Sequence, residues 1–199
     1  METIYAALLG YALGSIPFGL LLSFAAGQGD IRKIGSGNIG ATNVLRTGNK
    51  GLAAATLLLD MGKGFAAVMI AHQLFAPSAL AYGPVPVAAL GAVLGHCFPV
   101  WLKFKGGKGV ATNAGVCFGL AWPIGLVYAA VWLVALAAFR ISSLAGMAGV
   151  LGAVIAAMAF GNWAFVPVLA VIALLVIWLH RANIRRLLDG TEPKVGGKS

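Results

Sequence analysis

The chain has 199 residues, of which 60% are hydrophobic and only 10% are charged. Soluble domains are about 45–50% apolar and about 25% charged, so the composition excludes an ordinary soluble protein and predicts an all-α integral membrane protein. Fourteen Lys and Arg against five Asp and Glu give a net charge of +9. These cations lie between apolar runs, which favours a role in membrane orientation over nucleic-acid binding.

The first apolar run, Ile4 to Ala26, is predicted to cross the membrane from an outer N-terminus. Only Glu2 precedes the run, and the first arginine, Arg32, follows it. This pattern argues against a cleaved signal peptide and for a start outside the cytoplasm. The sequence from Gly14 to Gly19 interrupts the run, so we expect a kink or a close helix contact there.

The next stretch, Gln28 to Lys50, is called the first polar segment, and its composition suits phosphate binding. Glycines alternate with Ser, Asn and Thr from Gly35 to Thr42, and Arg46 follows. Hydroxyls, amides and backbone N–H groups donate to phosphate oxygens, and an arginine adds a two-pronged donor. The alternative interpretation is a helix start at Asn38–Thr42 that is capped by Ser or Asn.

Two further spans are predicted before the middle of the chain. Leu52 to Phe75 contains Asp60 and Lys63, one helical turn apart. Within an apolar span, we interpret these as a buried pair that neutralises itself, while leaving the role of Lys63 open. Val85 to Trp101 is the third span, and His96 near its end is interpreted as a packing residue.

The stretch from Phe104 to Thr112, called the glycine–lysine loop, reads FKGGKGVAT. Glycines allow a close backbone approach, and a helix that begins at Val110 would present N–H groups beside the lysines, as anion sites do. The alternative is a cytoplasmic turn whose lysines follow the positive-inside rule. The loop lacks the Walker A pattern, so an ATP- or GTP-driven motor is not indicated.

Two long apolar runs close the chain. Val110 to Phe139 exceeds the roughly 20 residues that cross a bilayer, and basic residues flank both of its ends. It must therefore cross twice, with a turn at Trp122-Pro123. The same reasoning divides Leu144 to Leu179 at Gly161–Trp163.

These turns give seven transmembrane helices in one domain, residues 1–192, with the C-terminus in the cytoplasm. The Lys and Arg residues then lie on the cytoplasmic side or within the second span. The fourth span, Gly109 to Ala121, is short, at about 20 Å for 1.5 Å per residue, so we expect it to start inside a cytoplasmic cavity. Residues 193–199 are predicted to be a disordered tail.

Polar residues also mark the ends of the last spans. His180 and Asn183 share a helix face, and a histidine that titrates near neutrality can act as a general base or hold a phosphate. The alternative is a helix C-terminus decorated with cations. Ser142 and Ser143, after Arg140, are interpreted as caps of the sixth span.

These polar groups all converge on the cytoplasmic side, in a site rich in donors and cations and poor in carboxylates. Such a site suits a phosphorylated polar substrate that meets an apolar one. A transporter for a small phosphorylated or carboxylated solute also fits broken helices and glycine-rich anion sites, although the outer halves of the spans are uncharged. Cys97 and Cys117 lie in apolar surroundings and support neither a disulfide framework nor a zinc site.

Motifs in order along nearly the whole chain carry a family resemblance. They are Gly35–Asn43 with Arg46 and Gly48, Leu59–Asp60 with Lys63–Gly64, Gly95–His96 with Phe98–Pro99, Phe104–Thr112, Arg140 with Ser143–Leu144, and His180 with Asn183–Ile184, Arg186–Leu187 and Gly190–Glu192. With these motifs the chain resembles the bacterial acyl-phosphate-dependent glycerol-3-phosphate acyltransferases.

The resemblance implies a seven-helix enzyme of the bacterial inner membrane with a cytoplasmic active site. It would transfer an acyl group from acyl phosphate to the 1-hydroxyl of glycerol 3-phosphate, in phospholipid biosynthesis. The products would be lysophosphatidic acid (1-acylglycerol 3-phosphate) and inorganic phosphate. Neither acyl-CoA nor acyl-carrier protein is used directly, no cofactor or metal is implied, and a separate soluble enzyme makes the acyl phosphate.

The resemblance also implies site residues at the matching positions. The catalytic group is Ser36, Arg46, Lys108, Ser143, His180 and Asn183, and the phosphate-binding group is Asn38, Thr42, Gly106, Gly107, Gly109 and Thr112. We expect cations and glycine amides to hold phosphate. His180, aligned by Asn183, would orient the attacking hydroxyl or accept its proton, unless a substrate phosphate takes that proton. The acyl chain would lie between the spans.

Overall fold

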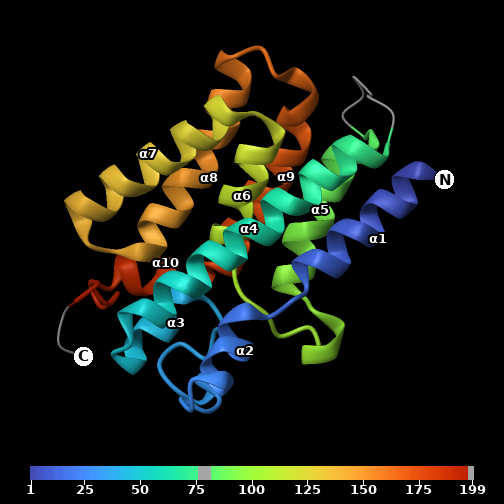
Figure 1. Ribbon diagram of the computed structural model, residues 1–199. Coiled ribbons are helices and arrows are strands. Elements are labelled where there is room, and N and C mark those ends of the chain that lie inside the picture. Colours follow the sequence, from blue (N-terminus) through green and yellow to red (C-terminus); the bar gives the residue numbers. More distant parts are fainter. Residues whose placement is uncertain (76–81, 197–199) are drawn as a thin grey trace.

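The computed structural model describes residues 1–75 and 82–196, and the regular structure within these ranges is entirely helical, as predicted (Figure 1). The α-helices are α1 (Glu2–Gly14), α2 (Phe18–Ala25), α3 (Ala41–Val44), α4 (Lys50–Leu74), α5 (Pro84–Cys97), α6 (Val110–Leu120), α7 (Trp122–Phe139), α8 (Ser142–Ala159), α9 (Val166–Leu179) and α10 (Arg181–Leu188). Short 3-10 turns occur at Ile31–Lys33, Leu45–Thr47, Val100–Leu102 and Trp163–Phe165.

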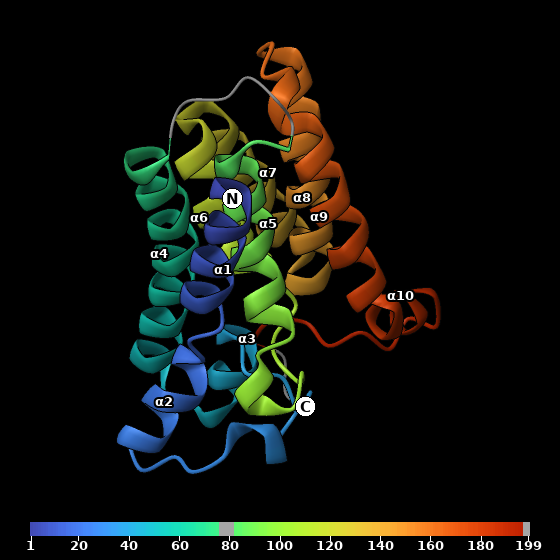
Figure 2. The ribbon, with the colours of Figure 1, turned by 90° about the vertical axis from the view of Figure 1, so that its right-hand side faces the viewer.

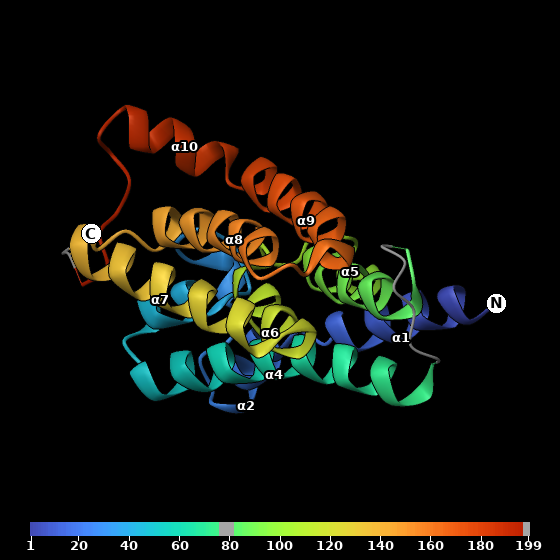
Figure 3. The same ribbon diagram turned by 90° about the horizontal axis from the view of Figure 1, so that it is seen from above.

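The long helices form one bundle, with α2, α3 and α10 toward one end of it (Figure 2). The main contacts pair α1 with α5, α4 with α6, and α7 with α8. Seen from above, α10 leaves the bundle beyond the end of α9 (Figure 3), and the two axes are bent by 59°. The three short helices and the first polar segment therefore lie at the same end of the bundle.

The structure supports five or six of the seven predicted membrane spans. Within the described residues, five helical segments are long and apolar enough to cross a membrane, and a sixth is added if α9 and α10 form one bent span. The five are Glu2–Ala25, Lys50–Leu74, Pro84–Leu102, Trp122–Phe139 and Ser142–Ala159. Helix α6 occupies the place of the predicted fourth span but has only 11 residues, as the short apolar stretch there indicated.

The predicted interruptions of the apolar runs are confirmed. Helix α1 ends at Gly14 and α2 begins at Phe18, directly after Pro17. Helix α7 begins at Trp122, with a proline in its first turn, and α9 likewise has a proline in its first turn. Proline lacks a backbone N–H, so it ends one helix and suits the first turn of the next.

Glycines allow helices α1 and α5 to approach closely. A Cβ atom on Gly14 would lie 2.0 Å from the Ala92 carbonyl oxygen, and one on Gly95 would lie 2.3 Å from the Tyr11 carbonyl oxygen. Small residues at helix interfaces are typical of membrane bundles, because packing there relies on backbone approach. Large apolar side chains instead remain exposed on the outside, as with Leu133 and Leu174.

The predicted pair inside the second span is confirmed, and it has a third member. Lys63 Nζ lies 2.6 Å from Asp60 Oδ1, and both side chains are 2% exposed. His96 is buried as predicted, but its Nδ1 lies 3.6 Å from the same carboxylate oxygen. Lys63 Nζ also donates to the carbonyl of Ile16, at 2.7 Å, in the break between α1 and α2.

The segment after α10 folds back toward the junction of α7 and α8. The Val195 N–H donates to the Arg140 carbonyl at 2.6 Å, and Arg140 Nη2 donates to the Val195 carbonyl at 3.1 Å. Residues 197–199 of the predicted disordered tail lie outside the described residues. The contact with Arg140 falls within residues 193–196 of that stretch.

The substitution Gly95→Leu is expected to destabilise the bundle, because its side chain would force α1 and α5 apart. We expect a loss of about 3 kcal/mol, measured as a lower thermal unfolding midpoint in detergent. Gly62→Ala is the matched control, since Gly62 is helical and has open space around its Cβ position. That control should hold or raise the midpoint, by up to about 1 kcal/mol. Equal midpoints for both variants would contradict the packing argument.

Candidate active site

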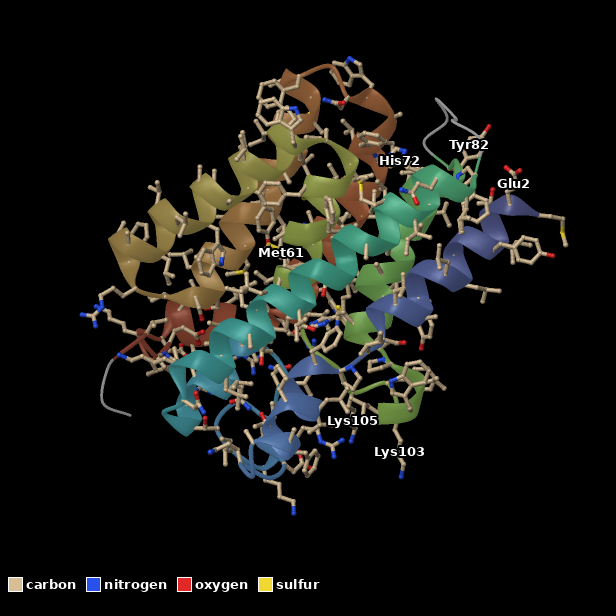
Figure 4. The ribbon with its side chains drawn as sticks, in the orientation of Figure 1. Glu2, Met61, His72, Tyr82, Lys103 and Lys105 are labelled. Atoms are coloured by element: carbon tan, nitrogen blue, oxygen red, sulfur yellow. The ribbon has the colours of Figure 1, made fainter. Side chains whose placement is uncertain are left out.

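The polar groups predicted from the sequence lie at one end of the bundle. Figure 4 labels Lys105, on the glycine–lysine loop, and Lys103, just before the loop, at this end. It labels Glu2, His72 and Tyr82 at the opposite end. The first polar segment, the glycine–lysine loop and α10 all reach this end (Figures 1 and 2). The contacts there form two groups of side chains.

The first group is organised by Asn43, a buried residue of α3. Its Nδ2 donates to the carbonyls of Ile31, at 2.7 Å, and Asn38, at 2.8 Å. Its Oδ1 accepts from the Ser36 N–H at 3.0 Å and from Arg46 Nη1 at 3.2 Å. The structure therefore brings predicted Ser36, Asn38 and Arg46 together around one amide. Sequence reasoning missed the role of Asn43, although it lies within the quoted motif.

Two glycines make room for this arrangement. Gly35 and Gly37 have φ angles of 54° and 70°, which side chains rarely adopt. A Cβ on Gly35 would lie 2.5 Å from Arg46 Nη1, so the arginine crosses directly over the backbone. A helix does begin within residues 38–42, at Ala41, but the predicted Ser or Asn cap is wrong, because the N-cap of α3 is Gly40 and no side chain caps it. Ser36 and Arg46 are thus exposed by a folded loop.

The glycine–lysine loop differs from the expectation in one respect. Helix α6 begins at Val110 as predicted, after Gly109 with φ of 85°. The N–H groups of Gly106 and Gly107, however, donate to the carbonyls of Cys97 and His96, each at 3.0 Å. These two amides are therefore engaged by the protein and do not serve a phosphate in this conformation. The amides of the first turn of α6 have no partners within the helix.

The second group gathers around Glu192. Ser143 Oγ donates to Glu192 Oε1 at 2.6 Å, and Asn183 Nδ2 donates to the same oxygen at 2.5 Å. Arg186 Nε donates to Glu192 Oε2 at 2.7 Å. Lys108 Nζ donates to Asn183 Oδ1. The structure thus joins predicted Lys108, Ser143 and Asn183 through a carboxylate that was not predicted.

Glu192 corrects two expectations. The site was expected to be poor in carboxylates, yet this side chain is 6% exposed and at its centre. Ser142 and Ser143 were interpreted as caps of the sixth span, but the N-cap of α8 is Ile141 and no side chain caps it. The signal for Glu192 was its place in the last quoted motif, directly after a turn at Gly190.

Electrostatics connect the two groups. The pKa of Lys108 is lowered to about 8, first by burial and then by the positive charges of Arg186, Arg46 and Arg181, against the opposing charge of Glu192. Arg46 belongs to the first group, so its charge acts on Lys108 across the site. Hydrogen bonds of the described residues do not join the side chains of Thr42 or Thr112 to either group.

His180 is a neutral residue beside the second group. It is 3% exposed, and its Nδ1 lies 2.7 Å from the Val176 carbonyl oxygen. Because a carbonyl only accepts, Nδ1 carries the proton and Nε2 is left as an acceptor. Burial lowers the pKa of His180 to about 4, and Lys108 acts in the same direction, while the Val176 contact and Glu192 oppose them. His180 is therefore uncharged at neutral pH.

Comparison with known proteins agrees with this arrangement over nearly the whole chain. A family model described as glycerol-3-phosphate acyltransferase matches residues 4–190. A relative of that name from Erythrobacter litoralis is 68% identical over 97% of this chain and 95% of the relative. Another from Novosphingobium aromaticivorans is 63% identical over 100% of this chain and 98% of the relative.

Two solved structures are also similar, and both are of PlsY (YgiH), described as an integral membrane glycerol 3-phosphate acyltransferase. Its glycerol 3-phosphate form has a TM-score of 0.90 at 37% identity, covering 98% of this chain and 96% of that one. Its lysophosphatidic acid form has a TM-score of 0.88 at 36% identity, with the same coverage. The chain is therefore an acyltransferase that belongs to the glycerol-3-phosphate acyltransferase family.

Proposed function

We propose that this enzyme transfers an acyl group from acyl phosphate to the 1-hydroxyl of glycerol 3-phosphate in phospholipid biosynthesis. The products are lysophosphatidic acid and inorganic phosphate. The observation that carries the proposal is that one end of the bundle holds two cations, Arg46 bonded to Asn43 and Lys108 bonded to Asn183, beside the neutral His180. Each substrate carries one phosphate, so a reaction between them needs two such groups. The glycerol 3-phosphate and lysophosphatidic acid forms of PlsY correspond to one substrate and one product.

The catalytic steps follow from these groups. Arg46 and Ser36 hold one phosphate, while Lys108 and the first-turn amides of α6 hold the other and stabilise the oxyanion that forms on the acyl carbon. The glycerol oxygen bonds to that carbon, and the bond from the carbon to the phosphate oxygen breaks. Acyl phosphate is already activated, so the reaction needs no covalent enzyme intermediate.

The proton of the attacking hydroxyl goes to a phosphate. His180 Nε2 accepts the hydroxyl hydrogen bond and orients the oxygen, while the hydrogen bonds of Asn183 keep Lys108 beside it. A histidine with a pKa of about 4 is a weaker base than a phosphate monoester, whose second pKa is about 6. His180 therefore aligns the nucleophile, and the phosphate group carries the proton away.

In the membrane, we place the site on the cytoplasmic face of the bacterial inner membrane, with seven spans and an outer N-terminus. The support is the position of lysines such as Lys103 and Lys105 at the site's end of the bundle and of Glu2 at the other (Figure 4), together with the positive-inside rule. Helix α6, with 11 residues, spans only part of the bilayer from the site. The acyl chain lies between the helices, and a soluble enzyme supplies the acyl phosphate.

Turnover of the purified protein tests the donor. Palmitoyl phosphate is supplied in detergent or lipid mesophase, with and without glycerol 3-phosphate, and phosphate and lysophosphatidic acid are both measured. Phosphate release that depends on glycerol 3-phosphate and matches the lysophosphatidic acid formed is the expected result. Turnover with acyl-CoA alone would overturn the donor. Glycerol 3-phosphate transport into proteoliposomes without acyl transfer would favour the solute transporter.

The affinity for acyl phosphate, whose phosphate lies beside Lys108 and the acyl carbon, is expected to fall as the pH rises through 8. Lys108 is charged below its pKa of about 8 and neutral above it, while the substrate stays doubly charged throughout. The KM should therefore rise by about tenfold per pH unit above 8, measured from pH 7 to 9.5. Lys108→Arg, whose guanidinium stays charged, should give a flat profile. A flat profile in the natural protein would contradict the role of Lys108.

Removing the His180 ring is expected to slow the chemical step at every neutral pH. His180→Ala should lower kcat by about 100-fold, equally from pH 6 to 8, because the ring is neutral across that range. His72→Ala is the control, since His72 is exposed at the opposite end of the bundle (Figure 4). A kcat within a few-fold of the natural value, or a defect confined to one end of the pH range, speaks against the orienting role.

A further inference from the structure

Asp60, Lys63 and His96 form a buried charge cluster that takes no part in the mechanism above. The Asp60 carboxylate lies 2.6 Å from Lys63 Nζ and 3.6 Å from His96 Nδ1. The side chains come from two helices, α4 and α5, and are at most 4% exposed. Two sets of contacts connect this cluster to the site. One set reaches the group around Asn43, and the other reaches the group around Glu192.

The first direction runs from Lys63 to the first polar segment. Lys63 Nζ donates to the Ile16 carbonyl at 2.7 Å and lies 5.7 Å from the ring centroid of Phe18. These residues flank the start of α2, which leads into the first polar segment. Gly19 of α2 in turn packs on that segment, because a Cβ there would lie 1.9 Å from the Ile39 carbonyl oxygen. Lys63 thereby fixes α2 and the loop beneath it.

The second direction runs from His96 to the glycine–lysine loop. The His96 carbonyl accepts the Gly107 N–H at 3.0 Å, and the ring lies against the same residue, since a Cβ on Gly107 would be 2.1 Å from His96 Nε2. Lys108 follows directly. Gly64, next to Lys63, also abuts the first turn of α6, where a Cβ would lie 2.2 Å from the Thr112 carbonyl oxygen.

Stability alone does not account for charges in this position. Replacing a buried ion pair by apolar side chains of similar volume is often neutral or stabilising, because desolvation of the charges offsets their attraction. A buried pair does, however, impose a direction and a distance that apolar side chains do not. The cluster ties α4 and α5 to a helix break on one side and to a loop on the other, so geometry is the property it supplies.

We propose that Asp60, Lys63 and His96 are positioning residues that hold the first polar segment and the glycine–lysine loop in register. Their register sets the separation between the phosphate held by Arg46 and the phosphate held by Lys108. The inference rests on the proposed function in assuming one phosphate at each group. Misplacement of reacting groups by about 1 Å costs up to about 100-fold in rate, so the cluster acts on catalysis without contact with substrate.

The test separates folding from positioning. The double variant D60N/K63M keeps the volume and removes both charges. Because the Ile16 carbonyl loses the Lys63 donor and keeps the Phe18 N–H, the variant should fold with a somewhat lower thermal midpoint, and kcat and KM are compared in the folded protein. Its kcat/KM for glycerol 3-phosphate should fall by about 100-fold, with a raised KM as well as a lower kcat. Lys63→Arg keeps the charge and the donor, so it should retain most of the activity. A purely structural role would lower the midpoint and leave KM unchanged in the folded fraction.

Two further variants keep the test decisive. Thr56→Val is the control, because Thr56 is buried on the same helix and, among the described residues, its hydroxyl bonds to the Leu52 carbonyl of that helix alone. It should leave kcat/KM unchanged. His96→Asn removes the ring that lies against Gly107 and faces Asp60, so it should raise KM, and it decides the matter if the double variant does not fold. Natural kcat/KM in the folded D60N/K63M protein, or in His96→Asn, overturns the inference.

Failure of the proposed function can be told apart from failure of this inference. If the natural protein does not turn over acyl phosphate, the donor is wrong, and binding of glycerol 3-phosphate by calorimetry then replaces turnover for the same variants. Affinity that is weaker in D60N/K63M than in Thr56→Val supports the positioning role under either donor. Equal affinity in all of the variants overturns it.

Discussion

Backbone N–H and carbonyl groups inside an apolar bundle must find partners within the protein, because lipid offers none. The break between α1 and α2 takes the Ile16 carbonyl out of the helix, and this carbonyl accepts from the Phe18 N–H at 3.1 Å and from Lys63 Nζ at 2.7 Å. The end of α5 frees another at Phe98, and it accepts the Tyr11 hydroxyl at 2.7 Å. Trp101 Nε1 donates to the Ser15 carbonyl at 2.8 Å. Each irregular stretch is thus tied to a neighbouring helix.

The same constraint bears on the two polar loops at the site's end of the bundle. The glycine–lysine loop follows α5, and its first amides bond to carbonyls of that helix, including Cys97. The first polar segment is likewise held from within, by the amide of Asn43. Both loops are therefore held by bonds within the protein. Ser36 and Arg46 are exposed on the first of them, and Lys108 on the second is directed toward Asn183. A site for charged substrates beside lipid needs this order, because water would otherwise compete for the same donors.

The sequence was a good guide wherever a property is local. Apolar length and proline positions predicted the helices and their breaks, and the helix start at Val110 followed from the glycines before it. Contacts between distant parts of the chain could not be predicted from residue patterns. Lys108 meets Asn183 across 75 residues, and only the family motifs placed both in one site. Glu192 was missed because a lone acid near a chain end reads as solvated, and the engagement of the Gly106 and Gly107 amides depends on the tertiary course of the loop.

Glu192 has a consequence for what the enzyme does with its products. Its carboxylate accepts from Ser143, Asn183 and Arg186, so these donors are already ordered by an anion of the protein itself. An arriving phosphate meets cations that are already partly neutralised by an internal anion. The entropy of ordering is spent during folding, but the attraction for any anion is weaker than the count of cations suggests. Such a built-in competitor favours rapid exchange of a bound phosphate group over its tight retention.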